Sequence, residues 1–103
     1  MSLKASHKAL QMAIRSLHGC ESVHVVTTPV TEVFQGKIVW DGEVETFSLI
    51  GHPRAVQCFA WAYQDDDGTN QITTVLALPP VQTPQDAVKA AIRAQVKNET
   101  KET

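Results

Sequence analysis

The alternation of apolar and polar residues predicts a helix near each end of the chain, with strands between them. Apolar residues recur at helical spacing over residues 3–18, where Ser2 or Ser6 could cap the start and Gly19 the end. The second helix is predicted to follow the run Thr83-Pro84-Gln85-Asp86. This run offers a hydroxyl cap, a proline at the first helical position and an acid at the third.

Short extended segments precede the middle of the chain. The first predicted strand, residues 22–28, ends at Pro29, because proline cannot donate to a strand ladder. Residues 30–34 are again extended, and Gly36 either forms a bulge or separates them from residues 37–40.

The dipeptide Asp41-Gly42 lies between alternating apolar residues and predicts a two-residue hairpin turn. That register puts Glu45 on the same face as Trp40 and Phe47. A carboxylate on such a face is a functional candidate if it lines a pocket mouth or a dimer rim. An exposed sheet edge, or a register shifted by one residue, would instead let Glu45 reach water.

The run from Arg54 to Tyr63 predicts a central strand that is apolar on both faces, with the aromatic side chains on one of them. We expect helices to cover one face and a partner subunit the other. A turn at 64–70 leads to a last strand at 71–78.

Short connections between neighbouring strands exclude a parallel arrangement. The sequence therefore predicts one α+β domain over residues 1–103, with an antiparallel sheet of four to five strands between an N-terminal and a C-terminal helix. Both helices are expected on one sheet face, and residues 97–103 are expected to be a frayed polar tail.

Composition indicates a cytoplasmic protein. With 43% hydrophobic and 19% charged residues the chain is an ordinary globular one. No apolar run approaches the ~18 residues that cross a bilayer, and the basic N-terminal stretch lacks a cleavage site, so we expect no signal peptide and no membrane partner. Two cysteines are too few for a disulfide framework, and a net charge of −2 argues against nonspecific nucleic-acid binding.

Candidate chemistry is sparse. His52 and Cys58 could act as base and nucleophile, but a cysteine in an apolar strand is typical of a core, and His52 between Gly51 and Pro53 is typical of a corner. The four histidines show no metal-binding spacing. We therefore expect no catalytic residue, metal or cofactor. The candidate ligand or interface residues are Trp40, Glu45, His52, Phe59, Trp61 and Tyr63.

Several short runs carry a family resemblance: Trp40-Asp41-Gly42, Gly51-His52-Pro53, Ala60-Trp61 and Leu78-Pro79-Pro80-Val81. They resemble small uncharacterised bacterial proteins carried as mobile integron gene cassettes. The resemblance covers roughly residues 30–92 and implies a bacterial, cytoplasmic accessory protein, without assigning any catalytic residue.

From these observations we favour a non-enzymatic homodimer acting as a binding or adaptor module. One alternative is a small-molecule binding protein with an aromatic pocket around Trp40 and Trp61, and another is a small enzyme using Glu45 or His52. The first two differ in whether the aromatic residues enter a two-fold interface or line a cavity of ~300 Å³ or more. The enzyme needs a carboxylate or imidazole facing that cavity.

Overall fold

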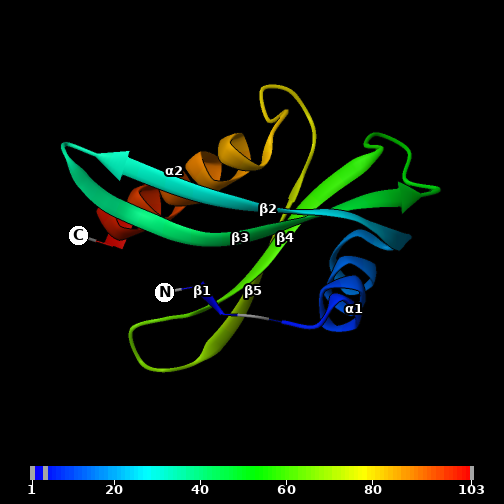
Figure 1. Ribbon diagram of the computed structural model, residues 1–103, viewed down its shortest axis with the longest axis horizontal. Coiled ribbons are helices and arrows are strands. Elements are labelled where there is room, and N and C mark those ends of the chain that lie inside the picture. Colours follow the sequence, from blue (N-terminus) through cyan, green and yellow to red (C-terminus); the bar gives the residue numbers. More distant parts are fainter. Residues whose placement is uncertain (1, 4, 103) are drawn as a thin grey trace.

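A computed structural model describes residues 2–3 and 5–102 of the chain, with the side chains of residues 5–94. It confirms the α+β class and the antiparallel sheet (Figure 1). The elements in chain order are β1 (Ser2–Leu3), α1 (His7–His18), β2 (Glu21–Phe34), β3 (Lys37–Ile50), β4 (Gln57–Gln64), β5 (Asn70–Leu76) and α2 (Pro84–Glu102). No helix among the described residues is long and apolar enough to cross a membrane.

Strand β4 lies at the centre of the sheet. It pairs with β5 along one edge and with β3 along the other, and β2 lies outside β3. The β3 pairing reaches only to Ala60 of β4, and β1 takes over beside Ala62 and Tyr63. Strand β3 therefore leaves β4 halfway along, and Figure 1 shows the β2–β3 hairpin crossing β4 and β5 at a steep angle.

The tight turn of the long hairpin lies at Gln35-Gly36, so the prediction of a turn at Asp41-Gly42 is wrong. Gln35 has φ 52° and Gly36 has φ 77°, which supply the two left-handed residues that a two-residue hairpin turn needs. Asp41 and Gly42 instead lie inside β3, opposite residues of β2. With this turn, β2 and β3 are each 14 residues long.

Pro29 also lies inside a strand, where the sequence predicts a strand end. It pairs with Glu43 within β2. In the part of the chain that the structure describes, β2 pairs with β3 alone, so it is an edge strand. A residue without an N–H is tolerated there, because the outer side of the strand has no ladder to lose.

The two helices pack on opposite faces of β4, which corrects the expectation that they share one face. Cys58 and Ala60 of β4 belong to the buried cluster that contains Leu10 and Ile14 of α1. Phe59 and Trp61 belong to the cluster that contains Ala87 and Val88 of α2. Successive side chains of a strand point to opposite faces, so each helix covers its own face. Figure 1 accordingly shows α1 and α2 on opposite sides of β4 and β5.

The helix ends follow the predicted chemistry in part. Ser6 caps α1 by accepting a hydrogen bond from the Ala9 N–H at 3.1 Å, and Gly19 ends it with φ 69°. Helix α1 is shorter than predicted, because Ser2–Leu3 form a strand beside β4. Thr83 caps α2 as predicted, with its hydroxyl accepting from the Asp86 N–H at 3.1 Å.

The boundaries of two further elements differ from those expected. Helix α2 includes residues 97–102, which we expected to form a frayed tail, and residue 103 lies outside the described residues. Strand β4 begins at Gln57, so Val56 precedes it, and Val56 is 77% exposed.

Candidate functional site

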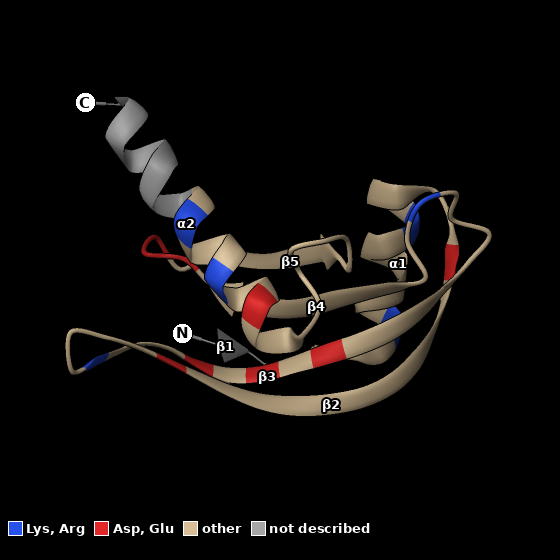
Figure 2. Cartoon of the chain, turned by 90° about the horizontal axis from the view of Figure 1, so that it is seen from above, with Lys and Arg blue, Asp and Glu red and all other residues tan. Residues whose placement is uncertain are grey.

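Three carboxylates follow one face of β3. Because β3 is continuous, Asp41, Glu43 and Glu45 alternate onto the same side, and the red segments along β3 in Figure 2 mark this acidic row. Trp40 and Val44 point to the other side. The expectation that Trp40 and Glu45 share a face is therefore wrong, and the reason is that no turn separates them.

A β-bulge in β2 brings two polar side chains over the acidic row. His24 lies opposite Phe47 and Thr27 lies opposite Glu45, with a shift of register between His24 and Val26. Residues three apart in a regular strand face opposite ways, but the extra residue Val25 puts His24 and Thr27 on the same face. That face is the one covered by α1.

Glu45 receives hydrogen bonds from both of these residues. The His24 Nε2–H donates to Glu45 Oε1 at 2.7 Å, because an ionised carboxylate can only accept, and the Thr27 hydroxyl donates to the same oxygen. The Glu45 side chain is 13% exposed and that of His24 is 24% exposed. The carboxylate is therefore largely withdrawn from water and held by two donors from the neighbouring strand.

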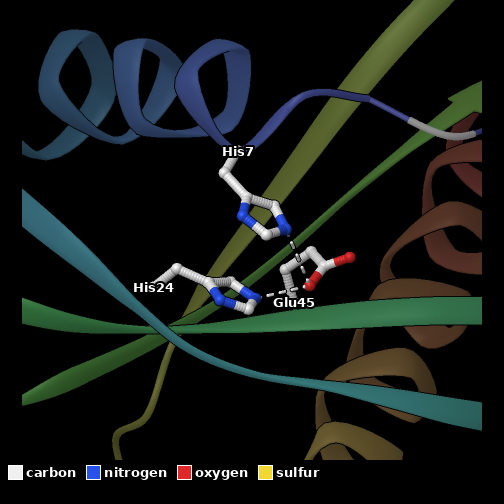
Figure 3. A group of neighbouring side chains, drawn as sticks. All are labelled: His7, His24 and Glu45. Atoms are coloured by element: carbon white, nitrogen blue, oxygen red, sulfur yellow. Dashed lines mark hydrogen bonds and ion pairs between the residues drawn. The ribbon is translucent and has the colours of Figure 1, made fainter.

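His7 joins this pair from a third element. It is the first residue of α1, fixed by the Ser6 cap, and its Nε2 lies 3.6 Å from Glu45 Oε1. Its ring stacks on that of His24, with centroids 3.7 Å apart and planes 14° from parallel. The Phe47 ring packs edge to face against both imidazoles. Its centroid lies 6.3 Å from that of His7 and 5.4 Å from that of His24. Figure 3 shows the two imidazoles directed at the carboxylate from α1 and β2.

A cavity of about 570 Å³ opens beside this cluster, where β3 leaves β4 and α1 begins. Its volume falls within the range of about 300–1,000 Å³ that is usual for small-molecule sites. Among the described residues that line it, none is Lys or Arg. The lining consists of Ala5, His7, Leu10, Thr27, Asp41, Gly42, Glu43, Glu45, Trp61 and Ala62.

The aromatic candidates belong mainly to the core beneath α2. Phe59 and Trp61 are buried there, with Trp40 and Tyr63 packed against them. The rings of Trp40 and Trp61 meet edge to face, with centroids 5.6 Å apart. Of these four residues only Trp61 also lines the cavity, so the wall carries one aromatic ring beside three carboxylates.

The remaining candidates lie away from Glu45. His52 forms the predicted corner, with its Nδ1 accepting from the backbone N–H groups of Arg54 at 3.0 Å and Ala55 at 2.9 Å. Cys58 is fully buried, and this burial raises the pKa of its thiol to about 12, which opposes a nucleophilic role at neutral pH. His18 lies near His52 and shares a hydrogen bond of 2.8 Å with the Thr74 hydroxyl.

The sequence pattern indicates Glu45 as a candidate but neither of the two histidines beside it. His7 and His24 stand 17 positions apart and show no metal-binding spacing, so only the fold brings them together. The signal that could have found His24 is the run Val23-His24-Val25-Val26, in which apolar residues break the strict alternation, as a bulge does.

Comparisons with known proteins add no assignment. No protein-family model matches the chain, and no match was found among curated proteins or among solved structures. The resemblance to integron cassette proteins, and with it a bacterial and cytoplasmic setting, stays a prediction.

Proposed function

We propose that this protein is a small binding module that takes a positively charged ligand into the cavity beside Glu45. The observation that carries the proposal is the acidic row of β3 along the cavity wall. Asp41, Glu43 and Glu45 all line the cavity, and its described lining holds no Lys or Arg. Carboxylates that face a common cavity repel one another, and a bound cation relieves that repulsion.

The graded exposure of the row supports the same proposal. Asp41 and Glu43 are exposed, whereas the Glu45 side chain is 13% exposed. The outer carboxylates would attract a cation from solution, and the less hydrated Glu45 would bind it more strongly, because charge-assisted hydrogen bonds strengthen as water is excluded.

A matched set of four-carbon probes tests the charge preference. We expect 1,4-diaminobutane to bind in isothermal titration calorimetry, and 1,4-butanediol and succinate to bind far more weakly or not at all. The three probes have the same chain length and differ in charge, so the comparison isolates the electrostatic contribution.

Matched variants locate the binding. Glu45→Gln removes the innermost charge, and we expect the diamine affinity to fall. Glu21→Gln removes an equal charge outside the cavity, where Glu21 pairs with Arg15 at 3.2 Å, and it should leave the affinity unchanged. Equal losses in both variants, or equal binding of all three probes, would refute a specific cation pocket.

We also propose that the chain forms a homodimer, through a surface other than the β4 face that the sequence indicates. Strand β4 is covered on both faces within one chain, so it no longer calls for a partner. Exposed apolar side chains instead lie on β2, where Val23 is 54% and Val26 is 47% exposed. A second copy that pairs its β2 with this edge would occupy the free backbone groups of β2 and set equivalent apolar side chains beside Val23 and Val26. A single 11.3 kDa species in sedimentation at micromolar concentration would refute the dimer.

A further inference from the structure

The two imidazoles beside Glu45 indicate which kind of cation this cavity would bind. One nitrogen each from His7 and His24 and one carboxylate oxygen from Glu45 lie within 4.8 Å of one another. We propose that these three residues bind a divalent transition-metal ion of the Zn²⁺ type. This inference rests on the proposed function, because the ion would be the cation that the acidic cavity takes.

The donor set fits such an ion. Two imidazole nitrogens and one carboxylate oxygen suit Zn²⁺ and its neighbours, whereas Ca²⁺ and Mg²⁺ prefer oxygen ligands alone. Bonds of about 2.0–2.2 Å in a tetrahedral arrangement put ligand atoms about 3.3 Å apart. Glu45 Oε1 lies 2.7 Å from His24 Nε2 and 3.6 Å from His7 Nε2, so the observed distances bracket this spacing. Because the two rings stack within 14° of parallel, one imidazole must rotate before both nitrogens point at the same ion. His24 Nε2 must also give up the proton that it donates to Glu45, which a change of tautomer to Nδ1–H provides.

The fold brings the three side chains close together before any ion arrives. They come from α1, β2 and β3, and the Phe47 ring, fully buried, supports both imidazoles. The Thr27 hydroxyl donates to Glu45 Oε1 and so orients the carboxylate. Partners of this kind, which contact a ligand residue and not the metal, commonly change metal affinity by about 10–100-fold.

The site is closed by protein on one side and open on the other. The exposed fraction of the side chain rises from 13% for Glu45 to 24% for His24 and 49% for His7. His7 and Glu45 also line the cavity. Three protein ligands leave the fourth position of a tetrahedral ion to water or to a small ligand from the cavity, which is the arrangement of an exchangeable rather than a purely structural metal site.

The first experiment measures Zn²⁺ binding directly. We expect isothermal titration of the intact chain at pH 7.5 to show one Zn²⁺ per chain. Mg²⁺ at the same concentration should give no comparable heat. In NMR spectra the imidazole resonances of His7 and His24 should shift on adding Zn²⁺, while those of His52 should stay in place.

Variants then assign the ligands. His7→Ala changes a half-exposed residue at a helix start and should remove binding without unfolding the protein, which circular dichroism checks. His24→Ala should also remove binding, and Thr27→Val should weaken it about tenfold or more. His18→Gln removes an imidazole from outside the cluster and should bind Zn²⁺ like the wild type.

Two results would overturn the metal site. The first is the absence of Zn²⁺ binding by the wild type, and the second is wild-type binding by the folded His7→Ala protein. A binding measurement with 1,4-diaminobutane distinguishes failure of the metal site from failure of the proposed cation-binding function. If the diamine binds and Zn²⁺ does not, the cavity is a cation site and the metal inference alone is wrong. If neither binds, both are wrong.

Discussion

Replacing Glu45 by Gln tests whether the carboxylate contributes to the stability of the fold. Glu45 accepts hydrogen bonds from the His24 imidazole and the Thr27 hydroxyl while its side chain is 13% exposed. Hydrogen bonds to a charged group contribute about 1.5–3 kcal/mol each, and those between neutral groups about 0.5–1.5 kcal/mol. Gln keeps one accepting oxygen but loses the charge, so each bond should weaken by about 1 kcal/mol. We expect Glu45→Gln to lower the free energy of unfolding by about 1–2 kcal/mol.

Urea unfolding followed by tryptophan fluorescence measures this difference. Glu43→Gln is the matched control, because Glu43 is exposed on the same face of β3, and its free energy of unfolding should stay within about 0.5 kcal/mol of the wild type. A Glu45→Gln protein that gains more than about 1 kcal/mol would show that desolvation of the carboxylate outweighs its hydrogen bonds, and the reasoning above would be refuted. An unchanged midpoint would show that the two bonds contribute nothing net.

Three further predictions concern other parts of the fold. Thr83→Ala should lower the free energy of unfolding by about 1 kcal/mol, because the α2 cap to the Asp86 N–H is lost, and an unchanged denaturation midpoint would contradict it. Native Cys58 should react with a thiol reagent far more slowly than the urea-unfolded chain, since burial raises its pKa to about 12, and rapid labelling of Cys58 in the folded protein would revive a catalytic role. Burial and the nearby His52 lower the pKa of His18 from 6.5 in the folded state. As the pH falls, His18 is therefore protonated in the unfolded chain before it is protonated in the folded chain. The free energy of unfolding should accordingly decrease below about pH 6.5. Melts at pH 7.5 and 5.5 should show a smaller decrease for His18→Gln, and equal decreases would refute this assignment.

Local chemistry predicted helix caps well, although not the helix lengths. Thr83 and Gly19 are caps whose effect needs only their immediate neighbours, and the structure uses both as expected. The apolar character of β4 on both faces also predicted a central strand correctly. It did not reveal what covers each face, because either two helices or a helix and a second subunit can bury the same side chains.

The hairpin turn shows where local signals fail. Asp41-Gly42 and Gln35-Gly36 both offer a glycine in the second turn position, and the Asp-Gly pair has the stronger intrinsic preference. The structure uses the Gln35-Gly36 turn, and Val30 and Val44 then pack together against α2, which is a long-range contact that the local signal does not contain. The residues between the two candidate turns therefore have different cross-strand partners from those that the Asp41-Gly42 turn predicts. Trp40 and Glu45 consequently lie on opposite faces of β3.

The bulge at Val25 is what lets His24 and Thr27, three positions apart, share one face of β2. Val25 is 51% exposed, and substituting its side chain should be nearly neutral. Deleting Val25 would leave His24 and Thr27 two positions apart, which is the spacing at which a regular strand puts both side chains on one face. They would keep Phe47 and Glu45 as partners in a ladder without a bulge. A related sequence could therefore keep the site with one residue fewer between the histidine and the threonine, and a search for relatives that share it must allow both spacings.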